Sequence, residues 1–253
     1  MPRRVEEGVG KVYSGRVFRS VMCMLCALLF AINFRGPQRA SAEGVFEPAG
    51  ADEPPAGAQI SELDRRLIAQ RPELDPLSWE LALYGRGSEP LEDEPVTVRV
   101  EGVSVDERIA GPLRAMLSDA RSQGLHVYLS CGYTDRAAQE HICRRCAERY
   151  GETAALAITG RPDENEHRSG LAVDIADRWY EDKDESIADT ELFAWLSEHC
   201  CEYGFILRYP EGKKELTGHV FEPWHFRYVG VEAARFMTAN GLTLEEFLEL
   251  YRY

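Results

Sequence analysis

The side chains in this sequence that could hold a metal ion are two histidines and an aspartate. Six residues separate His167 from Asp174, and His225 follows downstream. Asp174 lies between Val173 and Ile175, and a carboxylate in such apolar surroundings is costly to bury unless it is paired or bound to a cation. A catalytic zinc ion takes three protein ligands and leaves one position for water. The sequence therefore predicts one zinc ion per chain, held by His167, Asp174 and His225.

A glutamate close to the third predicted ligand could act on water. Glu222 precedes His225 by three residues, in a segment made rigid by Pro223. Glu222 can thus lie beside the metal without binding it, take a proton from the attacking water and pass it to a leaving amine. Zinc would lower the pKa of that water toward about 7 and polarise the scissile carbonyl. This combination predicts a zinc peptidase, and the alternative is a buried polar network without metal.

Helices and short strands must position these residues. Apolar spacing and capping signals predict helices at 106–122, 135–150, 190–203, 231–239 and 244–251. Strands are predicted at 125–130, 171–175, 205–209 and 224–229. The elements do not alternate regularly, which favours an α+β fold with a small antiparallel sheet, flanking helices and the zinc site in a central cleft. The acidic run 181–185 is expected to be a solvated loop.

Several motifs resemble one known family. They are Ser130–Tyr133, Gln139, Glu166–Asp174, Tyr203–Lys213, Thr217–Gly218 and Glu222–Gly230, in this order, and the resemblance covers roughly residues 60–245. The sequence is similar in these motifs to the vancomycin-resistance-type (VanY-like) D-alanyl-D-alanine carboxypeptidases, within the LAS-type zinc peptidases. The resemblance implies the zinc ligands and the base named above. It also implies that Gln139, Tyr209 and Trp224 help to bind the substrate.

Two positions depart from the pattern of that family. Thr134 stands where the family has an arginine that stabilises the charge developing on the carbonyl oxygen. Arg136 or Arg208 is expected to take over the role of that arginine. Asn165 replaces a serine before the first ligand, and its amide can still donate to a substrate carboxylate.

The implied reaction removes the C-terminal D-alanine from peptidoglycan stem peptides or their precursors. Alternatives within the family are an L,D-carboxypeptidase, a D,D-dipeptidase and a stem-peptide endopeptidase. A non-catalytic cell-wall binding module is the alternative from another class, although Glu222 would have no use there.

The N-terminal part of the chain carries a targeting signal in form. Basic residues precede an apolar run, Val21–Phe34, and Ala40-Ser41-Ala42 has the small-x-small pattern of a cleavage site. We therefore expect residues 1–42 to be a signal peptide or membrane anchor, 43–58 a flexible linker and 59–253 the peptidase domain. The domain would act outside the cytoplasm, secreted or anchored at the cell envelope, with membrane contact only through an uncleaved N-terminal segment.

Charge and cysteine content limit the possible partners. The chain of 253 residues has a formal net charge of −14, and seven basic and two acidic residues lie within 1–42, so the rest carries −19. Such an acidic body argues against nucleic acid as a partner. Five cysteines follow residue 42, an odd number that leaves at least one thiol free or paired between chains.

Overall fold

The computed structural model describes residues 61–84, 94–159, 165–180 and 183–253. The predicted signal or anchor segment, 1–42, and the predicted linker, 43–58, lie outside these ranges. Within them, no helix combines the length and the apolar character needed to cross a membrane.

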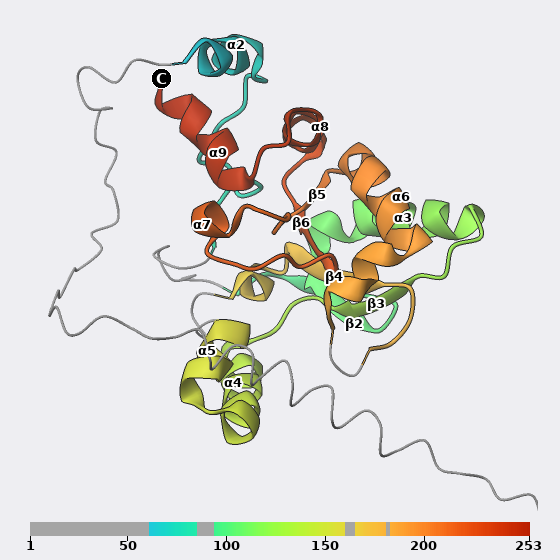
Figure 1. Ribbon diagram of the computed structural model, residues 1–253. Helices are drawn as coiled ribbons and strands as arrows, with labels where there is room; N and C mark the ends of the chain where they lie inside the picture. The colour runs from blue at the N-terminus through green and yellow to red at the C-terminus, as the bar shows by residue number, and fades with distance from the viewer. Residues whose placement is uncertain (1–60, 85–93, 160–164, 181–182) are drawn as a thin grey trace, which may run out of the picture. The chain divides into compact units, whose positions relative to one another are not determined.

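A four-stranded antiparallel sheet lies at the centre of the described domain, and its strand order is β3-β4-β6-β5 (Figure 1). The strands are β3 Tyr128–Cys131, β4 Ala172–Ala176, β6 His225–Tyr228 and β5 Phe205–Leu207. A separate antiparallel pair consists of β1 Thr97–Val100 and β2 Val103–Asp106. The described helices are α2 Glu62–Gln70, α3 Ala110–Ser122, α4 Arg136–Tyr150, α5 Glu152–Thr159, α6 Glu191–His199, α7 Lys214–Thr217, α8 Val231–Asn240 and α9 Leu244–Glu249. Together they confirm the predicted α+β class with a small antiparallel sheet and flanking helices.

The larger core forms between the sheet and helices α3 and α6, which contact each other. Val173 and Ile175 of β4 belong to this core with Leu113 and Leu117 of α3 and Leu196 of α6. Because side chains alternate along a strand, the residue between Val173 and Ile175 points to the opposite face. The strand therefore buries its apolar face against the helices and presents Asp174 on the other.

A second core joins α8 and α9 to the segment around α2. Leu67 of α2 and Leu81 pack there with Val229, Met237 and Phe247. The helix α2 thus belongs to the described domain, although it precedes the catalytic motifs by about a hundred residues.

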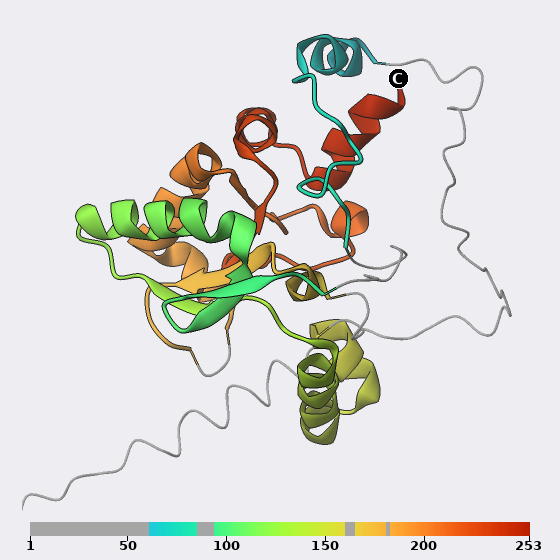
Figure 2. The same cartoon turned by 180° about the vertical axis from the view of Figure 1, so that it is seen from behind.

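Helix α4 begins where the sequence predicted, because the side chain of Asp135 accepts a hydrogen bond from the backbone N–H of Ala138. The helix α5 was not predicted, and it packs against α4, as both views show (Figures 1 and 2). Its sequence, ETAALAIT, lacks a clear apolar stripe at helical spacing. Its alanine, leucine and glutamate residues nevertheless favour a helix, and the contact with α4 adds to that preference.

Candidate metal centre

Three side chains with metal-binding atoms form a row across the sheet. Asp174 in β4 lies directly opposite Cys131 in β3 and opposite His225 in β6. Directly opposed residues of antiparallel strands point to the same face, with their Cβ atoms about 4.5–5.5 Å apart. The register alone therefore brings a thiol, a carboxylate and an imidazole together on the face opposite the larger core.

An irregularity in β3 decides which side chain faces Asp174. Leu129 pairs with Ile175, but the register shifts before Cys131, so Cys131 stands opposite Asp174. Without the shift, Ser130 would take that place. An extra residue of this kind redirects a side chain, and such bulges are common beside active sites.

His167 joins this row of side chains from outside the sheet. It belongs to the short 3₁₀ helix Glu166–Ser169, which precedes β4. The side chain of Asn165 caps this helix by accepting a hydrogen bond from the backbone N–H of His167 at 2.8 Å. Gly170 ends it with a φ of +70°, and an added Cβ there would lie 2.9 Å from the backbone nitrogen of Asp106. The tight turn at Gly170 thus fixes His167 close to Asp174.

The atoms converge on one carboxylate oxygen. Asp174 Oδ1 lies 3.3 Å from His167 Nε2 and 3.3 Å from His225 Nδ1. All three residues are buried, and Asp174 Oδ1 has no hydrogen-bond partner among the described residues. Tetrahedral ligands about 2.0–2.1 Å from a zinc ion would be about 3.3 Å apart, which these separations match. The residues present therefore fit a zinc ion.

A buried ionic network supports His225 from behind. Glu166 accepts hydrogen bonds from Arg208 Nε at 2.9 Å and from Arg227 Nη1 at 2.7 Å, and its other oxygen lies 3.1 Å from His225 Nε2. Burial opposes the charge of Glu166, but the two arginines hold the pKa of this carboxyl well below its usual range. A carboxylate on Nε2 leaves Nδ1 of His225 free to face Asp174 and a metal.

Lys183 contacts the cluster from outside the sheet. Its Nζ donates to Asp174 Oδ2, and it lies 6.0 Å from the centre of the Trp224 ring. Burial alone would raise the pKa of Asp174, yet His167 and Lys183 hold it well below its usual range. The expectation of a solvated loop at 181–185 is therefore wrong for Lys183, because its charge pairs with the buried Asp174.

Glu222 lies at the edge of the cluster, where 16% of its side chain is exposed. Its Oε2 is 3.5 Å from His225 Nδ1, and its Oε1 is 3.7 Å from His219 Nδ1. Tyr209 stacks on His219, with 4.1 Å between ring centres, and lies 4.8 Å from His225. His219 was not among the predicted site residues, because it has no partner at ligand spacing in the sequence.

The other predicted site residues lie at different depths. Arg208 is buried beneath the cluster, with three guanidinium nitrogens bonded to Glu166 and Glu245. Gln139 is buried in α4 and donates to the backbone oxygen of Thr159 at 3.0 Å. The structure thus places Arg208 and Gln139 in supporting contacts within the protein.

Arg136 is exposed on the first turn of α4, where its Nε bonds to Glu140 at 3.0 Å. Trp224 is half-buried next to His225, and its backbone oxygen accepts a hydrogen bond from Ile175. Trp224 reaches the cluster through Lys183, whose Nζ lies 6.0 Å from the centre of the Trp224 ring.

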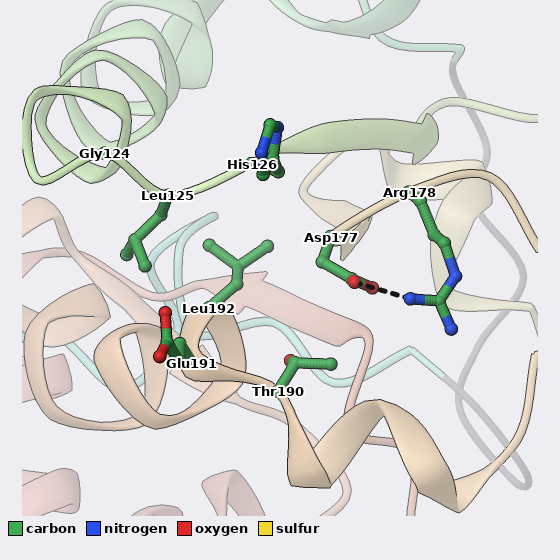
Figure 3. A pocket seen from close by; sticks show the side chains of 8 residues that line it. All are labelled: Gly124, Leu125, His126, Asp177, Arg178, Thr190, Glu191 and Leu192. Atoms are coloured by element: carbon green, nitrogen blue, oxygen red, sulfur yellow. Dashed lines mark hydrogen bonds and ion pairs between the residues drawn. The ribbon is translucent and has the colours of Figure 1, made fainter.

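A hollow of about 500 Å³ opens beyond the C-terminal end of β4 (Figure 3). It is lined by Gly124, Leu125, His126, Asp177, Arg178, Thr190, Glu191 and Leu192. None of the residues predicted for the site lines it. Asp177 and Arg178 pair with each other at 2.9 Å within it.

Fold and cluster together define a class, an α+β domain with a buried histidine–carboxylate cluster suited to a metal ion. The profile of the family VanY, D-alanyl-D-alanine carboxypeptidase, matches residues 102–231. The chain therefore belongs to the VanY family, which confirms the family expected from the motifs.

Two curated relatives show how far the similarity extends. A D-alanyl-D-alanine carboxypeptidase of Enterococcus faecalis is 34% identical over 202 residues, which cover 73% of this chain and 71% of that protein. A putative carboxypeptidase of Bacillus subtilis, YodJ, is 35% identical over 146 residues, which cover 57% of this chain. The match spans 54% of the length of YodJ.

Solved structures share the fold. A mutant of the vancomycin-resistance D,D-pentapeptidase VanY, in complex with Zn(II), is 33% identical with a TM-score of 0.60, over 68% of this chain and 99% of that one. The LD-carboxypeptidase LdcB is 32% identical with a TM-score of 0.54, over 62% of this chain and 75% of that one.

Sequence reasoning missed three residues of the cluster, Cys131, Lys183 and Glu166. Cys131 belongs to the quoted motif Ser130–Tyr133, but only the register places it opposite Asp174. Glu166 precedes His167 directly, and a glutamate next to a predicted ligand is a signal that could have been used.

Proposed function

We propose that this chain is a zinc-dependent carboxypeptidase that removes the C-terminal D-alanine from peptidoglycan stem peptides or their precursors. The observation that carries the proposal is the convergence of His167 Nε2 and His225 Nδ1 on Asp174 Oδ1, at 3.3 Å each, with Glu222 at the edge. Membership of the VanY family and the similarity to a VanY structure with Zn(II) support it.

In this proposal His167, Asp174 and His225 hold the zinc ion. When bound, zinc polarises the scissile carbonyl and makes water a better nucleophile at neutral pH. Glu222 takes the proton of the attacking water and delivers it to the leaving amine of D-alanine. Glu166 fixes the ring of His225, since it accepts from Nε2, and Arg208 and Arg227 keep Glu166 ionised.

The negative charge that develops on the substrate carbonyl needs a cation to stabilise it. The family pattern has an arginine for this role, and Thr134 stands at that position here. Arg208 is occupied with Glu166 and Glu245, and Arg136 bonds to Glu140 on the surface of α4. Lys183 is also paired, but its partner Asp174 is a predicted zinc ligand, so its Nζ lies at the cluster itself. We therefore assign the charge-stabilising role to Lys183.

The remaining predicted substrate contacts belong to the same proposal. Tyr209 and Trp224 would form apolar walls around the terminal residues of the peptide. Asn165 would also position His167, because its side chain accepts a hydrogen bond from the backbone N–H of His167. Gln139 and Asn165 both donate to the backbone oxygen of Thr159 at the end of α5. Action at the cell envelope follows from the substrate, and residues 1–42 would deliver the domain there.

Incubation with defined stem peptides, followed by mass spectrometry of the products, tests this function. We expect a stem pentapeptide to lose one D-alanine, and the loss to stop with a chelator and return with zinc. Cleavage of the tetrapeptide instead would favour an L,D-carboxypeptidase, which the similarity to LdcB also supports. Release of D-Ala-D-Ala dipeptide would indicate a dipeptidase. Zinc binding without any cleavage would indicate a binding module.

A further inference from the structure

We propose that Cys131 is a fourth protein ligand of the metal, an inference that rests on the zinc site proposed above. Cys131 stands in the same cross-strand row as Asp174 and His225. The bulge in β3 puts the thiol in that row where regular pairing would have put the hydroxyl of Ser130. The strand pairing therefore presents sulfur to the position where the predicted ligands meet.

The distances allow one ion to reach all of these atoms. The sulfur of Cys131, a ring nitrogen of His167 and a carboxylate oxygen of Asp174 all lie within 4.8 Å of one another. Tetrahedral ligands at about 2.3 Å for sulfur and 2.0–2.1 Å for nitrogen or oxygen are about 3.6 Å apart. A rotation of the Cys131 side chain toward the other ligands is therefore part of the inference.

Cys131 Sγ has two polar neighbours: it donates to the backbone oxygen of Gly132 at 3.7 Å, and one hydroxyl group can stabilise a thiolate. Thr134 Oγ1 lies 3.8 Å from the sulfur of Cys131 and can donate to it. Gly132, the next residue, has no room for a side chain, because an added Cβ would lie 2.4 Å from the backbone oxygen of Ser104. The loop is thus held closely on β2, with its sulfur and its hydroxyl on the side of the cluster.

Binding of Cys131 would close the coordination shell. The thiol gives its proton to solvent, and the sulfur takes the fourth position, which catalysis reserves for water. Four protein ligands are typical of a structural zinc site, whereas a hydrolase needs an open position. Cys131 therefore defines a resting state of the centre, from which the sulfur must move away before water can be activated.

Cobalt substitution of the purified protein tests the ligand directly. Replacement of zinc by Co(II) should give visible d–d bands and, in the near ultraviolet, a sulfur-to-cobalt charge-transfer band. Cys131→Ser should lose the charge-transfer band and keep the d–d bands. Cys201→Ser is the matched control and should keep both, because Cys201 bonds to the backbone oxygen of Glu198 on another part of the fold.

The outcomes separate this inference from the proposed function. Visible d–d bands without a charge-transfer band in the wild type would overturn the role of Cys131 and leave the metal site standing. No cobalt spectrum at all would overturn both. If Cys131→Ser does not fold, zinc-edge X-ray absorption of the wild type decides the matter. It should show a sulfur neighbour at about 2.3 Å, and a shell of nitrogen and oxygen alone at about 2.0–2.1 Å would reject the inference.

Discussion

Asp174 lies between the charged and metal-binding side chains of the site. Its two oxygens have different neighbours, with Lys183 on Oδ2 and both histidine nitrogens near Oδ1. A buried carboxylate is stable only with such compensation, because transfer of an unpaired charge from water into a protein interior is costly. The structure therefore satisfies one oxygen with a protein cation, and the other, which has no hydrogen-bond partner among the described residues, is the one that we propose binds the metal.

Glu222→Gln should retain zinc and lose most of the turnover. The amide keeps the size of the side chain but cannot take a proton from water, and general-base catalysis contributes about 10²–10⁴-fold in rate. Kinetics on a stem peptide and elemental analysis of the same sample measure both properties. Full activity in a zinc-loaded variant would show that another residue is the base.

Lys183→Ala should lower kcat by about 10²–10³-fold, the usual effect of removing one donor to a developing oxyanion. Zinc content should stay near one per chain, and Lys183→Arg should recover part of the rate. Lys214→Ala, an exposed lysine in α7, is the control and should have the kinetics of the wild type.

Arg136→Ala distinguishes the two candidate cations. Normal kinetics in this variant, with a slow Lys183→Ala, would assign the role to Lys183. A slow Arg136→Ala together with a normal Lys183→Ala would contradict our assignment.

At the scale of elements, the β2 strand holds both motifs of the site in place. The backbone N–H of Tyr133 donates to Ser104 at 2.6 Å, and that of Asp106 donates to Gly170 at 3.0 Å. Gly132 makes the first of these contacts possible, since any larger residue would collide with the backbone of β2. The hairpin β1-β2 therefore fixes the distance between the Cys131 loop and the His167 turn.

Gly132→Ala should destabilise the protein by about 1–3 kcal/mol, because the added methyl group has no space. It should also weaken zinc binding, since the loop must move away from β2 to make room for the methyl group and this moves the end of β3. Gly111→Ala is the matched control, because no atom lies within 4 Å of its added Cβ and alanine favours the helix α3. Thermal unfolding and a zinc titration measure both effects. A Gly132→Ala protein as stable as Gly111→Ala would contradict this account.

At the scale of the whole domain, one buried ionic network links the segments that carry the site. Glu166 precedes the first predicted ligand, Arg208 follows β5 and Arg227 lies in β6. Arg208 also pairs with Glu245 in α9, and Arg227 donates to the backbone oxygens of Glu80 and Ala82. The same charges therefore join the sheet, the C-terminal helix and the segment after α2.

This network should make the domain sensitive to acid. The folded pKa of Glu166 lies well below its unfolded value of about 4.3. The stability that it contributes is fully present above about pH 4.3 and is lost as the pH falls toward the folded pKa. Urea unfolding of the wild type in chelator, between neutral pH and about pH 3, should show this loss.

Glu166→Gln tests the origin of the acid sensitivity. It should cost about 3–5 kcal/mol at neutral pH, because it leaves the buried Arg227 without its carboxylate and Arg208 with Glu245 alone, and it should flatten the dependence on pH. Glu245→Gln is the control with a smaller expected loss, since the Glu245 side chain is 24% exposed. An unchanged slope in Glu166→Gln would show that other carboxyl groups carry the acid sensitivity.

The sequence by itself determined the helices and strands that carry the motifs and the chemical type of the site. Asp174 between Val173 and Ile175 predicted a carboxylate on one face of a buried strand, and the structure has this alternation. Such features follow from local spacing, and a local pattern can be read from the chain alone.

Only the tertiary structure decided what surrounds that site. The bulge that turns Cys131 toward Asp174 depends on the pairing of β3 with β4, which lie more than forty residues apart. Lys183 belongs to an acidic run that the sequence predicted to be solvated, but its side chain pairs with Asp174, because a buried carboxylate needs a compensating charge. Arg208 is buried beneath the site for the same reason, because it pairs with the buried Glu166. Strand register and the compensation of buried charge are properties of segments distant in sequence, so no local spacing reveals them.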